Sequence, residues 1–420
     1  MRTSSSPCPP RRETPFMRHD APEAGGAPRG IATAFCGASV GCGHGRAGLA
    51  VRDAMRVRGQ LGQASFVDVL ELAPAWFTRT YRDGYLRAVR HAPRAVGAIY
   101  DRTDVPRHGR TGVRSMLDRV QDRVLGEFRR HAALHGSDVV VSTHFLTSAI
   151  LGRMRETGAL RAPLVTIVTD EHPHAVWLHR GSDMTCVASP AAREAAIAGG
   201  LDAARVAVTG IPVDPRFGMA SPRTQGTGRP SVLVTGGGCG IGDVGPTVMA
   251  LLDGLRDSDV TVVSGRNVVL ESAMVALRAS RRGEPRGNAL HVVGYTKMMH
   301  EFMAGADVLV GKPGGLTTTE ARALGLPMVL LRPIPGQEER NARMLVAAGA
   351  AARAAGPLEA AAHVAAILGE PARLAGMRRA AGAIGRPRAA FDVAACVADA
   401  VSRPAAHCAD RIVGVRISAA

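Results

Sequence analysis

The chain has 420 residues, more than one ordinary hydrophobic core accommodates, and this length predicts two domains. Its composition, 46% hydrophobic and 21% charged, is globular and excludes a disordered or fibrous protein. The net charge of +16 comes from arginines interleaved with acidic residues, which argues against a nucleic-acid partner and favours an anionic membrane surface or a phosphate-bearing substrate.

Residues 1–29 are rich in Ser, Pro and Arg, and we expect a disordered leader without the apolar segment of a signal peptide. From Ile31 onward, short apolar runs alternate with amphipathic segments, which is typical of an α/β domain with a parallel sheet. We assign residues 30–215 to this N-terminal domain. Its predicted strands are Ile31–Cys36, Ser65–Val69, Val139–Ser142, Leu164–Val168, Met184–Val187 and Val206–Val208.

A Pro-, Gly- and Thr-rich stretch at 216–230 predicts a linker, after which the strand–helix pattern resumes. We assign residues 231–402 to a C-terminal domain and 403–420 to a tail. The Ala-rich segment from Asn341 to about Val401 is predicted to be helical, with an interruption near Gly385–Pro387. The predicted strands are Ser231–Thr235, Val260–Val263, Ala289–Val292, Val308–Val310 and Met328–Leu331.

Each half opens with a strand followed by a glycine-rich turn and a helix. The first turn is Phe35–Gly45, and the second is Thr235–Gly242, which includes Gly238. Glycines allow a ligand to approach the backbone, and the following helix start offers free N–H groups to an anion. Each turn alone is a weak signal, because a tight strand–helix connection without a ligand looks the same.

The loop Gly311–Glu320 is more specific for a phosphate group. It follows a buried strand, and Gly314 and Gly315 precede a helix whose first turn is rich in hydroxyls. Hydroxyls, free N–H groups and the positive end of a helix are well suited to two phosphates. The hydroxyl-bearing residues are Thr317, Thr318 and Thr319.

Lys312 strengthens this interpretation, because Lys297 is the only other lysine in a strongly arginine-rich chain. A compact ammonium suits a phosphate, although a surface lysine at a loop tip remains the alternative. The loop after the next strand carries Gln337 and Glu338, which can bond to sugar hydroxyls. In a doubly wound sheet this loop lies at the ligand-binding edge.

Taken together, these stretches resemble the GT-B glycosyltransferases that make monogalactosyl- and glucosyl-diacylglycerol, relatives of the enzyme that adds N-acetylglucosamine to the peptidoglycan lipid precursor. The resemblance extends from about Ile31 to Gly349. The segments that carry it are Gly41–His44, Val168–His179, Thr209–Val213, Gly236–Gly242, His291–Tyr295, Gly311–Glu320 and Pro335–Asn341.

The resemblance implies a GT-B fold, with two Rossmann-like domains facing across a cleft, and a role for each matching position. His44 would be the general base, and Asp170 would support it or position the acceptor. The donor site would comprise Gly294 and Tyr295 for the uracil, Glu320 for the ribose, Lys312, Gly315 and Thr317 for the diphosphate, Gln337 and Glu338 for the hexose, and the adjoining Gly238, Gly314 and Thr318.

The segment Trp76–Pro93 mixes aromatic residues with arginines, as an interfacial helix does. A solvated helix with an ordinary core face is the alternative. The resemblance implies that a lipid acceptor enters here. The residues expected at the acceptor and membrane side are Trp76, Tyr81, Tyr85, Arg87, Arg90, His174 and Trp177. Trp177 also suits a position in the core or the cleft wall.

The expected activity is therefore inverting transfer of galactose or glucose from a UDP-sugar to diacylglycerol or a similar lipid. We expect neither a metal nor a cofactor; a metal site at His172, His174 and His179 is less favoured. The cysteine count is odd and includes no C-x-x-C pair, which favours a reducing compartment. No run of about eighteen apolar residues occurs, so we expect a cytoplasmic protein held peripherally at the inner membrane face. The alternatives are a UDP-N-acetylglucosamine-dependent transferase with a lipid-linked or soluble acceptor, a nucleotide-sugar-binding protein or epimerase, and a nucleic-acid-binding module.

Overall fold

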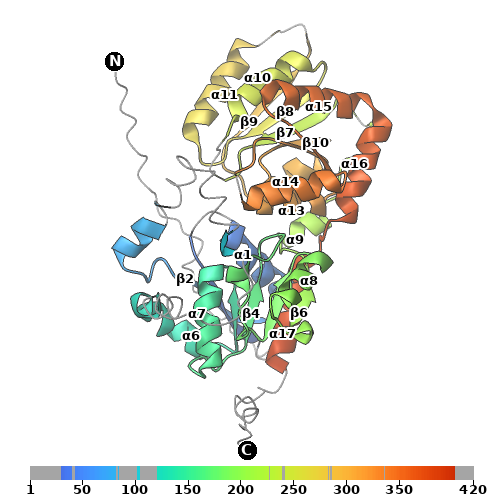
Figure 1. The fold of residues 1–420 in the computed structure, drawn as a ribbon. Helices are drawn as coiled ribbons and strands as arrows, with labels where there is room; N and C mark the ends of the chain where they lie inside the picture. The colour runs from blue at the N-terminus through green and yellow to red at the C-terminus, as the bar shows by residue number, and fades with distance from the viewer. Residues whose placement is uncertain are drawn as a thin grey trace, which may run out of the picture.

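In the computed structural model of the chain, two parallel α/β domains lie one above the other (Figure 1). The structure describes residues 30–39, 43–81, 84, 102–104, 121–226, 228–238, 242–281, 283, 286–334 and 336–402. The leader, the tail and most of the segment after Tyr81 lie outside these ranges.

The N-terminal sheet has the strand order β2-β1-β3-β4-β5-β6, with every pair parallel. The strands are valine-rich runs buried on both faces, as expected when helices cover both sides of a parallel sheet. They are β1 (Ile31–Gly37), β2 (Leu61–Asp68), β3 (Val139–Ser142), β4 (Leu164–Ile167), β5 (Met184–Val187) and β6 (Val206–Val208). The helices are α1 (Gly43–Val57), α5 (Gly126–Arg129), α6 (Ala132–Gly136), α7 (Phe145–Glu156), α8 (Pro190–Ala198) and the short 3₁₀ turns η1 (Ala175–Trp177) and η2 (Ala203–Arg205).

The C-terminal sheet has the order β12-β11-β10-β7-β8-β9, also parallel throughout. Its strands are β7 (Ser231–Thr235), β8 (Asp259–Val263), β9 (Ala289–Val293), β10 (Val308–Gly311), β11 (Met328–Leu330) and β12 (Ala351–Arg353). Its helices are α10 (Val244–Gly254), α11 (Val268–Ser280), α12 (Met299–Ala304), α13 (Gly315–Ala323), α14 (Gln337–Ala347), α15 (Pro357–Gly369) and α16 (Pro371–Ala383).

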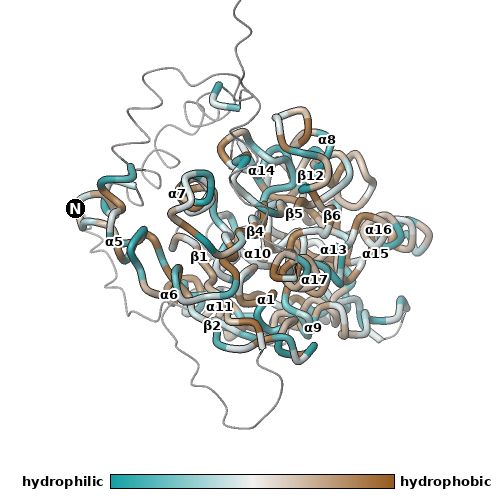
Figure 2. The backbone as a smooth tube through the Cα atoms, turned by 90° about the horizontal axis from the view of Figure 1, so that it is seen from below, coloured by the Kyte–Doolittle hydropathy of each residue, from teal (hydrophilic) through white to brown (hydrophobic). Residues whose placement is uncertain are grey.

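The predicted two-domain α/β architecture is confirmed, and each predicted strand is present within a few residues of its expected ends. In Figure 2 the central strands are largely hydrophobic, and the hydrophilic segments lie toward the outside. The linker is not wholly irregular. Asp214 accepts a hydrogen bond of 3.0 Å from the backbone N–H of Arg216, and this cap starts the short helix α9 (Pro215–Met219).

Two features of the Ala-rich C-terminal segment differ from the prediction. The expected long helix is divided by β12, which pairs with β11 after Gly349 (φ 73°) ends α14. The last helix, α17 (Ala389–Ser402), packs on the N-terminal domain, where Val393 and Val397 join the core formed by Phe35 and Val141. The C-terminal domain assigned from sequence therefore extends too far, because α17 returns to the first domain (Figure 1).

Candidate functional site between the two domains

Both sheets reverse their strand order at a point that faces the other domain. In the N-terminal sheet the reversal lies between β1 and β3, where Cys36 pairs with Ser142. In the C-terminal sheet it lies between β7 and β10, where Thr235 pairs with Gly311. Ligands of doubly wound sheets bind in the crevice at such points, beyond the carboxyl ends of the strands. The helices that begin there, α1 and α13, approach each other across the cleft (Figure 1).

His44, in the first turn of α1, is held at this crevice from the N-terminal side. Its Nδ1 lies 3.0 Å from the backbone oxygen of Thr143 and 2.8 Å from Oγ1 of Thr169. A carbonyl oxygen can only accept, so Nδ1 carries the proton and donates it, which leaves the lone pair on Nε2. Burial lowers the pKa of His44 to about 4. His44 is therefore a neutral imidazole with an unprotonated Nε2 that no described residue hydrogen-bonds.

His144 is a second buried histidine at this point, and the sequence analysis missed it. Its Nδ1 accepts a hydrogen bond from the N–H of Leu146 at 3.1 Å, which caps the start of α7. Its ring lies edge to face with that of His44, with centroids 4.6 Å apart. Burial and the neighbouring His44 lower its pKa well below the ordinary value, so it stays uncharged. Its position directly after β3 was the available signal, because the carboxyl ends of β1 and β3 meet.

Asp170 lies between the domains and is 8% exposed. Its Oδ2 accepts a 2.8 Å hydrogen bond from Nε1 of Trp177, and its Oδ1 accepts one from the side-chain amide of Gln337 in α14. Burial raises its pKa to about 6 although both bonds favour the ionised form. Trp177 is only 1% exposed, so its indole cannot form an acceptor-binding surface, and we assign it the positioning of Asp170.

The C-terminal side of the cleft is formed by the start of α13. Gly314 is the N-cap residue and supplies no side chain to the free N–H groups. The Nζ atom of Lys312 lies 3.3 Å from Oε1 of Glu338, whose Oε2 accepts a 2.8 Å bond from the N–H of Ile334. A Cβ on Gly242 would lie 3.6 Å from the Lys312 side chain. The lysine therefore lies between the second glycine turn and α13, as a phosphate site requires.

The hydroxyls of this helix differ in their hydrogen bonding. Thr318 is 1% exposed, and its hydroxyl donates to the backbone oxygens of Gly314 and Gly315 at 3.0 and 3.1 Å. Such bonds to residues three and four positions earlier are usual for threonine in a helix. The Thr318 hydroxyl is therefore hydrogen-bonded within its own helix, whereas Thr317 is half-buried and its hydroxyl bonds to no described residue. The diphosphate contacts expected for these threonines stay a prediction.

Glu320 is 5% exposed, and its nearest cation is Arg46 of α1, whose NH1 lies 3.8 Å from its Oε1. Burial raises its pKa to about 7, although Arg46 favours the charged form. This carboxyl group therefore titrates near neutral pH and lies on the face of α13 toward the N-terminal domain.

The residues expected around the nucleobase follow β9. The ring of Tyr295 is 47% exposed, and the guanidinium of Arg266 lies 4.9 Å from its centroid. The backbone N–H of Arg266 donates to the oxygen of Gly238 at 3.1 Å. A Cβ on Gly294 would lie 2.9 Å from a carboxylate oxygen of Glu271. Gly238, Gly294 and Tyr295 thus line one connected surface, to which the structure adds Arg266.

Residues 75–81 on the expected acceptor side are helical, and Trp76 is 60% exposed. Tyr81 stacks on Phe77, with ring centroids 5.7 Å apart. His174 is 2% exposed, and its Nδ1 accepts from the N–H of Val176 at 3.2 Å, so it serves the local turn rather than a free surface. The remaining residues expected here or in the first glycine turn lie outside the described residues: Gly41, Cys42, Tyr85, Arg87 and Arg90.

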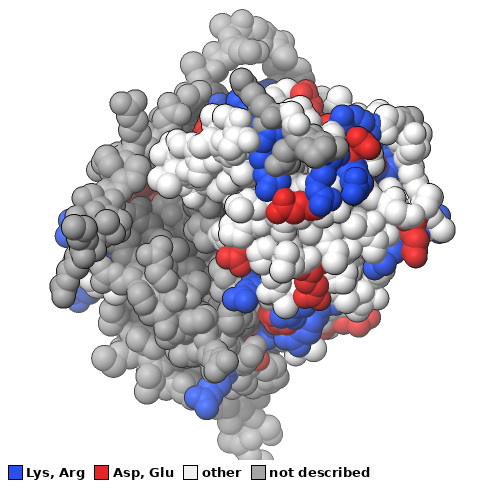
Figure 3. Space-filling view, turned by 90° about the horizontal axis from the view of Figure 1, so that it is seen from above, with Lys and Arg blue, Asp and Glu red and all other residues white. Residues whose placement is uncertain are grey.

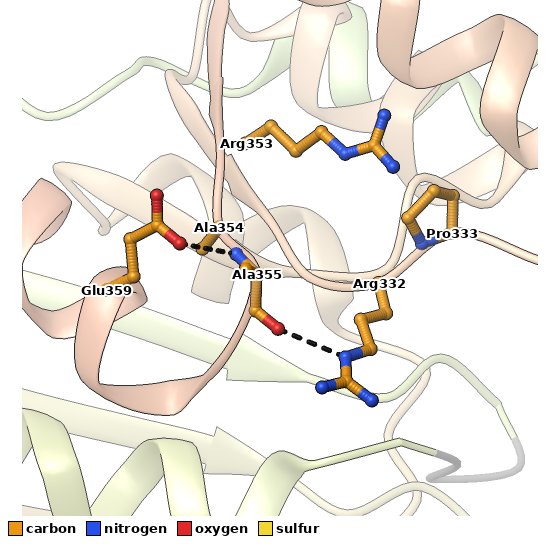
Figure 4. A pocket seen from close by; sticks show the side chains of 6 residues that line it. All are labelled: Arg332, Pro333, Arg353, Ala354, Ala355 and Glu359. Atoms are coloured by element: carbon orange, nitrogen blue, oxygen red, sulfur yellow. Dashed lines mark hydrogen bonds between the residues drawn. The ribbon is translucent and has the colours of Figure 1, made fainter.

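A surface cavity of about 420 Å³ is lined by residues that follow β11 and β12 (Figure 4). Its arginines are engaged locally: Arg332 donates to the oxygen of Ala355 at 3.0 Å, and Arg353 bonds to Glu339 at 2.6 Å. On the face shown in Figure 3, acidic side chains lie among the basic ones.

Comparisons with known proteins agree with this geometry. The family described as Monogalactosyldiacylglycerol (MGDG) synthase matches residues 44–213, and the Glycosyltransferase family 28 C-terminal domain matches residues 231–355. A probable monogalactosyldiacylglycerol synthase 2, chloroplastic, of Oryza sativa subsp. indica is 30% identical over 347 residues, which cover 78% of this chain and 71% of that protein. The processive diacylglycerol beta-glucosyltransferase of Bacillus subtilis is 32% identical over 227 residues, 52% of this chain and 57% of that protein's length.

Among solved structures, MurG of Acinetobacter baumannii superimposes with a TM-score of 0.54 at 17% identity, covering 89% of this chain and 100% of that one. UDP-GlcNAc 2-epimerase of Neisseria meningitidis, bound to UDP-GlcNAc, gives 0.52 at 13% identity, covering 87% and 99%. These similarities support the GT-B fold, and the sequence relatives support the family. The chain therefore belongs to the monogalactosyldiacylglycerol synthase family of GT-B glycosyltransferases.

Proposed function

We propose that the protein transfers a hexose from a UDP-sugar to diacylglycerol, with inversion at the anomeric carbon, on the surface of a membrane. The observation that carries the proposal is the neutral His44, whose Nδ1 proton is held by Thr143 and whose Nε2 is left to accept a proton. Family membership supports the class of reaction. The relatives' names supply the candidate acceptor.

In the proposed reaction the acceptor hydroxyl attacks the anomeric carbon and gives its proton to Nε2 of His44. The bond between that carbon and the diphosphate oxygen breaks, and its electron pair leaves with UDP. The N–H groups at the start of α13 and the ammonium of Lys312 stabilise the growing charge on the diphosphate. A diphosphate bound at α13 would also raise the pKa of His44 from its low value, because a nearby negative charge favours imidazolium.

Ionised Asp170 is proposed to accept a hydrogen bond from the acceptor and to hold it beside His44. In the structure its oxygens take bonds from Trp177 and Gln337, and each oxygen keeps a second lone pair. When a donor sugar occupies the cleft, the Gln337 amide can turn from Asp170 to the hexose. The two residues would then bind the two substrates on opposite sides of the reacting carbon.

A lipid acceptor requires contact with a membrane. The exposed indole of Trp76 supports such contact, since tryptophan favours the boundary between water and lipid. None of the helices in the described part of the chain is long and apolar enough to cross a bilayer. We propose a peripheral association on the cytoplasmic side, to which the net charge of +16 would contribute attraction to anionic lipids.

The direct test is incubation of the purified chain with diacylglycerol vesicles and, separately, UDP-galactose, UDP-glucose and UDP-N-acetylglucosamine. We expect UDP release with glycolipid formation for a hexose donor, and a β-linked product from an α-linked donor by NMR. The His44→Ala variant should lose turnover while retaining UDP binding. Turnover only with UDP-N-acetylglucosamine would replace the assigned donor, and the absence of any lipid product would refute the proposal.

A further inference from the structure

A buried ion pair joins the two domains beside the proposed site. The guanidinium of Arg322 in α13 donates to the carboxylate of Glu171, and both side chains are only 8% exposed. The other ion pairs that cross the cleft among the described residues are more exposed on at least one side. Arg46 is 36% exposed opposite Glu320, and Arg340 is 26% exposed opposite Asp104.

Arg322 is braced against its own helix. Its Nε donates to the backbone oxygen of Thr318 at 3.3 Å, and its NH2 lies 3.2 Å from Oγ1 of Thr319. These residues belong to the part of α13 that follows the proposed diphosphate site. Because Nε and NH2 of Arg322 are both hydrogen-bonded to residues of α13, the guanidinium is fixed relative to this helix. The ion pair with Glu171 therefore links the segment after Asp170 to α13 itself.

Glu171 lies in an equally constrained place, directly after Asp170. The backbone oxygen of the preceding Thr169 would lie 3.5 Å from a Cβ on Gly315, the first residue of α13. Thr169 therefore lies beside the start of α13, with space for only a small group such as a methyl between its oxygen and Gly315. The ion pair between Glu171 and Arg322 thus holds the segment 169–171 of the N-terminal domain next to the helix that forms the proposed diphosphate site.

We propose that Glu171 and Arg322 are positioning residues that close the cleft around the donor and set His44 and Asp170 against the start of α13. This inference rests on the proposed function, since it assigns the pair to the same reaction. Two charges desolvated at the domain interface are mutually satisfied only in the closed arrangement. Loss of either charge favours the open arrangement, because the remaining charge is better solvated there.

The test uses Glu171→Gln, which keeps the shape and one acceptor oxygen but removes the charge. The matched control is Asp122→Asn, whose Arg153 partner lies in the same domain at 2.5 Å. Solution X-ray scattering, UDP affinity by calorimetry, and kcat and KM with saturating donor are measured for both variants. We expect a larger radius of gyration for Glu171→Gln and no change for Asp122→Asn.

We expect kcat of Glu171→Gln to fall by about tenfold or more, because a small displacement of positioned groups is costly to catalysis. Its UDP affinity should change by less than about threefold, because the proposed UDP contacts lie in the C-terminal domain. Scattering and kcat equal to those of Asp122→Asn would overturn the inference. A parallel loss of UDP affinity and kcat would also overturn it, by placing the pair in the donor site. The scattering measurement does not depend on turnover. It therefore tests the role of the ion pair even if the proposed transferase activity is absent.

Discussion

The substitution Trp177→Phe isolates the hydrogen bond that holds Asp170 ionised. Phenylalanine fills most of the buried indole space but lacks the N–H that lies 2.8 Å from Oδ2. A hydrogen bond to a charged group contributes about 1.5–3 kcal/mol. At 1.36 kcal/mol per pKa unit, its loss raises the pKa of Asp170 from about 6 to about 7–8. The ionised fraction at pH 7 then falls from about nine-tenths to between about one-half and one-tenth.

The assay is kcat/KM for glycolipid formation from about pH 5 to about pH 9. For Trp177→Phe we expect the acidic limb to move up by about one to two pH units, with activity recovering at the alkaline end. Phe35→Leu serves as the control, because it removes buried aromatic packing from the same domain without touching Asp170. An unshifted acidic limb, or a uniform loss at every pH, would refute the role assigned to this hydrogen bond.

Three further predictions concern α13 and the loop before it. Lys312→Gln should weaken UDP binding by about tenfold or more, whereas Lys297→Gln should not, as calorimetry would measure; equal affinities would exclude Lys312 from the phosphate site. Thr317→Val should weaken UDP binding more than Thr318→Val does, and the reverse order would show that the buried Thr318 hydroxyl is the ligand. Because the pKa of Glu320 rises from 4.5 to about 7 on folding, native protein binds more protons between these values, so its ionisation lowers stability as pH rises through 7. Glu320→Gln should therefore raise the free energy of unfolding at pH 8 by up to about 3 kcal/mol and change it little at pH 4, as measured by urea denaturation. Equal effects at both pH values would contradict a buried carboxyl group with a raised pKa.

The secondary structure was largely predictable, because parallel strands buried on both faces appear as short apolar runs such as Val139–Ser142. The strand β12 was not predictable by this route. Its sequence, Ala351–Arg353, lies in an alanine-rich segment with strong helix propensity. Pairing with β11 overrides that propensity, and pairing is a tertiary property. For the same reason the sequence could not place α17, whose apolar face suits either domain until the chain path is known.

What the sequence determined by itself is the class of site: two glycine-rich turns, a lysine-bearing loop before a helix, and motifs that identify the family. These signals are local, and the contacts they imply are made by the backbone near each motif. Tertiary structure decided which side chains meet. The rings of His144 and His44 contact each other, and Asp170 accepts a hydrogen bond from Gln337 of the other domain. The Thr318 hydroxyl donates to a backbone oxygen of its own helix. The spacing of residues in the sequence does not predict such side-chain contacts, because they depend on the strand order and on how the two domains pack together.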